Sequence, residues 1–286
     1  MKSVLLTVAL FTSITSFAQA NPTWRSWNQP VEPFRIVGNI YYVGASDIAS
    51  YLITTPKGHI LLDGGFVETA PMIRDNIRKL GFNIKDVKYL LNSHAHNDHA
   101  AGLAQLKQWT GAQFLASRAD GEQIARGGHS DPMWGDKMTF PPTKPDRFIG
   151  DGENVIIGDT VMTAHLTPGH TKGCTTWTTT VEEGGHSYHV LFLCSVSAPG
   201  YKLVNNPKYP NIVEDYRHTF AYLKTLPCDV FLAAHANFFD METKRAAQQR
   251  GGTRNPFIDP QEFPEFLANS ERQFEAELAE QKRQSK

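Results

Sequence analysis

The chain has 286 residues, 41% of them hydrophobic, and a formal net charge of −1. This length allows one large domain or two small ones with a substantial core. A nearly neutral charge without a basic stripe gives no indication of a nucleic-acid or anionic-membrane partner. Three cysteines leave at least one thiol unpaired or intermolecular, so a disulfide framework is not expected to hold the fold together.

The first twenty residues have the pattern of a secretory signal peptide. Lys2 precedes the apolar run VLLTVALF, and the small-residue sequence AQA ends at Ala20. We expect cleavage before Asn21, export to the periplasm and a single mature domain over residues 21–286. The apolar run is far shorter than the roughly 20 residues that cross a bilayer, so no membrane anchor is expected.

Short β-rich runs alternate with helical ones in the first half of the chain. NIYYVG, SYLITTP and GHILLDGG indicate successive strands because β-branched and aromatic residues alternate there with turn residues. Residues 68–80 carry apolar side chains at helical spacing and precede Gly81, which predicts a helix. VKYLLNS then indicates a buried strand, and AGLAQLKQWTG indicates a helix that ends at Gly111.

The second half continues the alternation. AQFLAS and RADGEQIAR predict a strand and a helix, followed by a long loop over residues 127–146 whose apolar residues, among them Phe140, are expected to be exposed. NVIIG, TVMTAHLTP, CTTWTTTV and SYHVLFLCSV indicate strands. A helix over residues 213–226, a strand at DVFLAAH and an amphipathic C-terminal helix complete the chain. This order predicts an α/β or α+β fold with helix-covered sheets.

Residues 92–102, NSHAHNDHAAG, place three histidines and a carboxylate within six residues at the end of a predicted strand. In an extended segment His94 and His96 point the same way and can bind one ion, whereas Asp98 and His99 can turn towards a second. Histidines with one carboxylate suit zinc better than calcium or magnesium. A structural zinc site is less well supported, because such sites are usually cysteine-rich cages.

Four ligands do not complete two tetrahedral sites, so further histidines are expected. LTPGHTKG places His170 just after a predicted strand, and FLAAHANFF places His235 at the end of another. Ligand sites in α/β proteins lie beyond the carboxyl ends of strands, so three strands should deliver their histidines to one place. The remaining histidines lack such a setting and are expected to be ordinary residues.

SHAHNDHAAG, LTPGHTKG, LLDGG and AAHANFF, in this order, resemble the motifs of the metallo-β-lactamase superfamily. The resemblance to subclass B3 enzymes covers essentially the whole mature chain, including PFRIVGNIYYVG, ARGGHSD, CTTW, SAPGY and YPNIVEDYRHTF. It implies an αββα sandwich of two mixed β-sheets flanked by helices, with two zinc ions at its rim. The implied ligands are His94, His96 and His170 for the first zinc, and Asp98, His99 and His235 for the second.

The resemblance also implies a reaction. A hydroxide shared by the zinc ions would open the β-lactam amide of penicillins, cephalosporins and carbapenems, which gives antibiotic resistance. Asp98 would hold the second zinc and accept a hydrogen bond from the hydroxide. Asp63 of LLDGG would support the ligand loop through hydrogen bonds.

Four residues are implied as substrate contacts. Ser195 and Ser197 would anchor the substrate carboxylate, although two serines can also simply end a strand. Trp134 and Met138 of the long loop would form an apolar wall against substrate side groups.

Serine at position 195 is a poor zinc ligand, and the resemblance places it where other lactamases use cysteine, so water would fill that position. Strand alternation should aim the thiol of Cys194 away from Ser195, as a core or hairpin cysteine. Cys174 lies nearly opposite Cys194 across a predicted hairpin, and a disulfide between them is left open.

Two other functions compete with this one. A periplasmic lactonase or thioester hydrolase on the same di-zinc scaffold would need less help with its leaving group, but export and Ser195 argue against it. A zinc-binding protein without catalysis would not need six ligands with open water positions. We expect a monomer acting on a small-molecule substrate, and the order of preference among the three antibiotic classes stays open.

Overall fold

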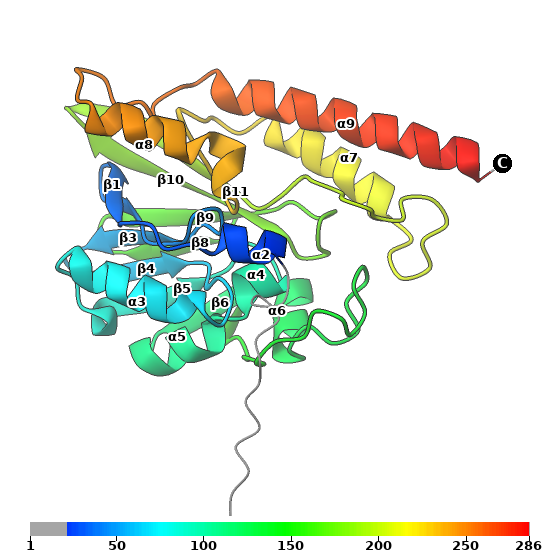
Figure 1. The fold of residues 1–286 in the computed structure, drawn as a ribbon, viewed down its shortest axis with the longest axis horizontal. Coiled ribbons are helices and arrows are strands. Elements are labelled where there is room, and N and C mark those ends of the chain that lie inside the picture. Colours follow the sequence, from blue (N-terminus) through cyan, green and yellow to red (C-terminus); the bar gives the residue numbers. More distant parts are fainter. Residues whose placement is uncertain (1–21, 286) are drawn as a thin grey trace, which may run out of the picture.

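The computed structural model describes residues 22–285 (Figure 1). The predicted signal peptide lies outside the described residues. The helices are α2 (Pro22–Trp27), α3 (Thr69–Lys79), α4 (Asn97–Ala100), α5 (Leu103–Thr110), α6 (Arg118–Ala125), α7 (Ile212–Leu223), α8 (Met241–Gln249) and α9 (Glu262–Gln284). Two short 3₁₀ helices are η1 (Ile84–Asp86) and η2 (Ala236–Phe239).

The strands form two sheets. The first contains β1 (Phe34–Val37), β2 (Ile40–Tyr42), β3 (Tyr51–Thr55), β4 (Gly58–Leu62), β5 (Val87–Leu91), β6 (Gln113–Ser117) and β7 (Arg147–Ile149), in sequential order. The second contains β8 (Asn154–Ile157), β9 (Thr160–Leu166), β10 (Thr175–Glu183), β11 (His186–Leu193) and β12 (Val230–Ala233), in the order β12-β11-β10-β9-β8. Both sheets are mixed, because β4 to β7 run parallel in the first and β11 and β12 run parallel in the second.

The strands of the first sheet are covered on both faces. Tyr51 and Ile53 of β3 belong to the core between the sheets, whereas Leu52 packs into a second core. That second core also contains Ile73 of α3 and Leu106 of α5. Since successive side chains of a strand point to opposite faces, a strand buried on both faces needs the continuous hydrophobic run that the sequence shows here.

Helices cover the outer face of each sheet. Figure 1 shows α3, α5 and α6 beside the first sheet and α7, α8 and α9 on the opposite side of the molecule, beside the second. The ring of Phe274 on α9 lies 4.7 Å from that of Tyr216 on α7, and two ion pairs, Arg217–Glu275 and Lys224–Glu271, join the same helices. The predicted αββα sandwich is therefore confirmed.

The two predicted helices over residues 68–80 and 213–226 correspond to α3 and α7. The sequence did not predict α8, because only Met241 of that helix is buried and no apolar stripe marks it. Phe140 was wrongly expected to be exposed. Its side chain is only 8% exposed and packs into the second core, while its amide donates to the Gly127 carbonyl and closes the long loop.

Cys174 and Cys194 form a disulfide with their Cα atoms 5.9 Å apart, and Cys228 is free and half-buried. Both bonded cysteines are fully buried at the ends of β10 and β11. The bond that the sequence left open is therefore present, and the odd thiol is Cys228.

Replacing Cys174 and Cys194 together by alanine should lower the free energy of unfolding by about 3 kcal/mol, the chain-entropy expectation for a loop of this length. The bond closes a sequence separation of 20 residues. Urea unfolding of the metal-free protein measures this loss, and metal analysis of the same variant should show unchanged stoichiometry. Loss of a metal ion would mean that a cysteine is a ligand.

Candidate metal centre and its cleft

The predicted ligands lie beyond the carboxyl ends of three strands. β5 ends just before the segment that carries His94 and His96, β9 ends four residues before His170, and β12 ends two residues before His235. β12 pairs parallel with β11, and β10 pairs antiparallel with both β11 and β9. β9, β11 and β12 therefore run in the same direction. The fold therefore brings the six predicted ligands to one edge of the sandwich.

His94, His96 and His170 form one compact group. The centroids of their rings lie 4.6–4.9 Å apart, and one ligand atom from each lies within 4.8 Å of the other two. Nε2 of His94 is buried and has no hydrogen-bond partner. A buried ring nitrogen without a partner is costly unless something occupies the space before it, so this atom fits a metal ligand.

Asp98, His99 and His235 form the second group. Oδ2 of Asp98 lies 3.4 Å from Nε2 of His99 and 3.5 Å from Nε2 of His235, and the two Nε2 atoms are 3.3 Å apart. A tetrahedral zinc ion with ligands at 2.0–2.1 Å places neighbouring ligand atoms about 3.3 Å apart. The spacing of all three atoms therefore fits one zinc ion. His94 is also close to Asp98 and His99, so the two groups are adjacent.

The Nδ1 atoms of three of the predicted ligands face oxygen atoms. Nδ1 of His170 lies 2.8 Å from the carbonyl oxygen of Ser197, and Nδ1 of His235 lies 3.0 Å from Oδ2 of Asp47. Such acceptors hold the proton on Nδ1 and leave Nε2 free to bind a metal. Nδ1 of His99 faces Oδ2 of Asp63 at 3.5 Å.

The three imidazoles of the first group are held neutral. Burial, together with the neighbouring His99, lowers the pKa of His94 well below its usual value, and burial with His96 does the same for His170. Burial lowers the pKa of His96 to about 4, although Asp98 opposes the shift. Neutral imidazole is the form that binds a metal, so these side chains are prepared for ligation.

Carboxylates shift the pKa values of the second group in the opposite direction. Burial disfavours the charged form of His99, but the carboxylates of Asp98 and Asp63 raise its pKa to about 10. The pKa of His235 is also raised despite its burial, through Asp47 and Asp98. Although burial works in the opposite direction, His99 and His235 hold the pKa of Asp98 well below its usual value. A metal ion binding here would displace these protons.

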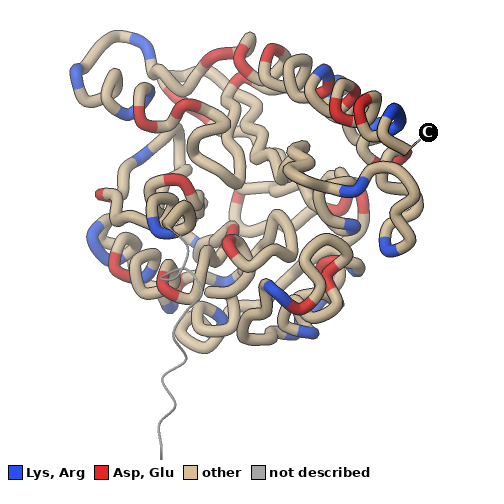
Figure 2. The backbone as a smooth tube through the Cα atoms, turned by 45° about the vertical axis from the view of Figure 1, so that its right-hand side comes forward, with Lys and Arg blue, Asp and Glu red and all other residues tan. Residues whose placement is uncertain are grey.

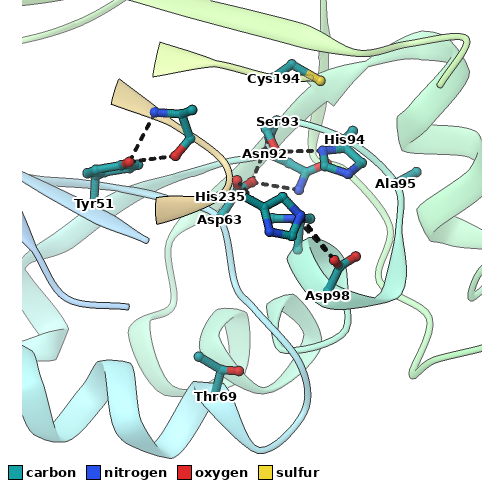
Figure 3. Close-up of polar contacts among 12 residues, drawn as sticks. Tyr51, Asp63, Thr69, Asn92, Ser93, His94, Ala95, Asp98, Cys194 and His235 are labelled. Atoms are coloured by element: carbon teal, nitrogen blue, oxygen red, sulfur yellow. Dashed lines mark hydrogen bonds and ion pairs between the residues drawn. The ribbon is translucent and has the colours of Figure 1, made fainter. Parts of the chain in front are cut away.

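Asp63 supports the ligand loop from the end of β4 (Figure 3). Its Oδ1 accepts hydrogen bonds from Nδ2 of Asn92 at 3.0 Å and from the amide of Ser93 at 2.7 Å. The side chain is 1% exposed, and its backbone has a φ of 66°, a left-handed conformation that an aspartate tolerates better than most residues. The sequence LLDGG therefore places a buried carboxylate directly against the ligand loop.

A cleft of about 410 Å³ opens over the metal groups. Ser197, Trp134 and Met138 line it, as does Asp98. Ser195 does not line the cleft, because it is 2% exposed and its hydroxyl lies behind Ser197, 3.1 Å from the Ser197 hydroxyl. Three of the four predicted substrate contacts thus reach the cleft.

Sequence reasoning missed four aromatic residues that also line the cleft. Trp24 and Trp27 of α2, together with Phe66 and Phe238, line it. The ring of Trp27 lies 5.4 Å from that of His235 in an edge-to-face arrangement. The two tryptophans lie three residues apart on a helix of only six residues, and no apolar period announces such a short element.

Comparisons with known proteins agree with this geometry. Residues 43–235 match the model of the metallo-beta-lactamase superfamily. The native FEZ-1 metallo-beta-lactamase from Legionella gormanii is 44% identical, with a TM-score of 0.87, over 89% of this chain and 98% of that one. BJP-1, a subclass B3 metallo-beta-lactamase of Bradyrhizobium japonicum, is 42% identical with a TM-score of 0.86, over 92% and 99%.

A more distant similarity relates the chain to a lactonase. The N-acyl homoserine lactonase AttM of Agrobacterium fabrum is 29% identical over an alignment 154 residues long, which covers 43% of this chain and 56% of the relative. The chain thus spans about half the length of the curated relatives that it matches. The superfamily match covers most of the chain and includes the ligand positions from His94 to His235. The chain therefore belongs to the metallo-β-lactamase superfamily.

Proposed function

We propose that the protein is a subclass B3 metallo-β-lactamase that hydrolyses the β-lactam amide of penicillins, cephalosporins and carbapenems and so gives antibiotic resistance. One observation carries the proposal. Two adjacent ligand groups at the base of an open cleft occur in a chain that is 42–44% identical to metallo-β-lactamases over about nine tenths of its length.

Zinc is the proposed cofactor, with two ions per chain. Five imidazoles and one carboxylate are a donor set that zinc prefers and that calcium and magnesium do not. The spacing near 3.3–3.5 Å in the second group and the unpartnered Nε2 of His94 in the first support one ion in each. When bound, such ions supply an activated water and stabilise developing negative charge.

The chain's own residues bind and orient the substrate in this proposal. Ser197 lies at the cleft surface and donates its hydroxyl to the substrate carboxylate, and Ser195 supports it from behind at 3.1 Å. Trp134, Met138 and Trp27, which all line the cleft, enclose the substrate's apolar groups and exclude water. Asp98 holds the second metal and is the hydrogen-bond acceptor for the attacking water.

The proposal also covers the cellular location, the oligomeric state and the domain organisation of the enzyme. A periplasmic enzyme, with residues 1–20 removed, is supported by the signal-peptide pattern of the sequence. Over residues 22–285, none of the helices combines the length and the apolarity that a membrane crossing requires. Acidic and basic residues are interspersed along the described chain in Figure 2, which fits a small-molecule substrate. We also propose that the enzyme is a monomer. The core between the sheets runs from Ile36 to Leu278, which supports a single domain.

A lactonase is the competing function, because part of the chain is 29% identical to the AttM lactonase. A substrate panel separates the two. The zinc-loaded protein should show its highest kcat/KM on a penicillin, a cephalosporin or a carbapenem, and much lower values on an N-acyl homoserine lactone and on a thioester. A higher kcat/KM on the lactone than on every β-lactam would replace this proposal with the lactonase.

A further inference from the structure

Asp120 is a buried carboxylate that lies outside every ligand motif of the sequence. It belongs to the first turn of α6 and is 3% exposed. It accepts three hydrogen bonds, from the amide of Ala95 at 2.9 Å, from the hydroxyl of Thr171 at 2.6 Å and from the amide of Gly173 at 2.8 Å. Every one of these donors lies in a loop that carries proposed metal ligands.

The three bonds join two loops that come from different sheets. Ala95 lies between His94 and His96, in the loop that follows β5 of the first sheet. Thr171 follows His170, in the loop that follows β9 of the second sheet. One carboxylate therefore spans the gap between the sheets at the point where their imidazoles meet.

The contact at Gly173 leaves little freedom for movement. The hydroxyl of Ser117, at the end of β6, donates to the carbonyl of Gly173 at 2.6 Å. A Cβ atom on residue 173 would lie 2.2 Å from that hydroxyl oxygen and 2.5 Å from the amide nitrogen of Asp120, so only glycine permits this approach. The His170 loop is thus held against α6 at a fixed distance.

Stability alone does not explain a carboxylate at this position. Burial raises the pKa of Asp120 to about 6, although the bonds from Thr171, Gly173 and Ala95 act in the opposite direction. The pKa of an aspartate is about 3.9 in the unfolded chain, and a higher pKa in the folded protein means that folding disfavours the ionised form. At pH 7 the charge of Asp120 therefore lowers the free energy of unfolding. The carboxylate instead provides, on one side chain, acceptors for the three hydrogen bonds that join the two ligand loops.

We propose that Asp120 is a positioning residue of the metal centre: it fixes His170 relative to His94 and His96 and so sets the metal affinity of the three-histidine group. The inference rests on the proposed metal site, but it concerns a residue that touches no metal. Hydrogen bonds that orient metal ligands typically change affinity or activity by 10- to 100-fold when they are removed.

Asp120→Asn tests this role with almost no change of volume. An amide has one acceptor oxygen and one NH₂ group, so the three donors cannot all be satisfied at once. Metal affinity, measured by competition with a chromophoric chelator, should fall by about 10- to 100-fold at one site per chain. The visible spectrum of the cobalt-substituted variant should change as well, because it reports the ligand geometry directly.

Three further variants separate positioning from general stability. Thr171→Val removes one donor to Asp120 and should weaken the same site, whereas Thr171→Ser retains the hydroxyl and should restore wild-type affinity. Asp146→Asn alters a carboxylate that accepts from the amide of Phe114 on β6 at 2.8 Å and pairs with Lys107. It should reduce the thermal midpoint and leave metal affinity unchanged, because Asp146 contacts no ligand loop.

The outcomes are distinct. Weaker metal binding in Asp120→Asn and Thr171→Val, but not in Thr171→Ser or Asp146→Asn, supports the positioning role. Wild-type affinity in folded Asp120→Asn, or in Thr171→Val if the first variant does not fold, overturns it, as does an equal loss in Asp146→Asn. Failure of the wild-type protein to bind metal would instead overturn the proposed function itself.

Discussion

Chelation of the bound metals should reduce β-lactam hydrolysis to the background rate, and zinc should restore it. The hydroxyl of Ser197, which lines the cleft, lies 3.1 Å from that of Ser195, and neither serine has a basic side chain as a hydrogen-bond partner in the described chain. The hydroxyl of Tyr201 also lines the cleft, 3.4 Å from Nδ1 of His170, but burial raises its pKa well above the usual value, so it is not an activated nucleophile. The measurement is penicillin opening before chelation, after chelation with residual metal quantified, and after zinc is returned.

Magnesium provides the matched control for that experiment. It prefers oxygen ligands in octahedral geometry and should not restore activity to a centre built from five imidazoles and one carboxylate. Hydrolysis that persists in protein shown to be metal-free would exclude the proposed reaction.

His235→Ala should remove the second metal and retain the first. His235 lies 3.3–3.5 Å from Asp98 and His99 and makes no part of the group of His94, His96 and His170. We expect metal content to fall from two ions per chain to one, and kcat to fall much further than KM changes, because the substrate contacts remain in place.

Asp47→Asn is the control for that variant. Asp47 accepts from His235 Nδ1 at 3.0 Å and from the amide of Asn237 at 2.9 Å, so it orients the ligand without binding metal. Its replacement should weaken the second metal by about 10- to 100-fold and retain it at saturating zinc. Loss of both metals in His235→Ala would show that the two groups are not independent.

The ligands could be predicted from the sequence because local patterns mark them. His94, His96, Asp98 and His99 lie within one short segment at a strand end, and His170 and His235 each follow a recognisable strand. The alternating α/β pattern then predicts that these side chains lie together beyond the carboxyl ends of their strands. For these residues, order along the chain and secondary structure were sufficient.

The residues that support the ligands could not be predicted in this way. Asp47 meets His235 across 188 residues of sequence, and Asp120 meets Thr171 across 51. Neither lies in a motif, and an isolated aspartate in a loop or a first helical turn has many ordinary explanations. Their roles depend on how the two sheets pack, which no local period encodes.

The same limit applies to the walls of the cleft and to parts of the fold. Trp24 and Trp27 reach the metal centre only because α2 is folded back against Phe66 and His235. The three residues of β7 are too few for an alternating pattern to be recognised. Long strands such as β10 and amphipathic helices such as α7 contain enough residues for their hydrophobic period to be recognised in the sequence.

The central claim is that two adjacent metal ions occupy this cleft, and anomalous diffraction from crystals of the zinc-loaded protein tests it most directly. Maps from data collected on both sides of the zinc absorption edge should contain two peaks per chain. One should lie among His94, His96 and His170, and the other among Asp98, His99 and His235. No zinc peak in the cleft, or a single peak held by other residues, would contradict the account.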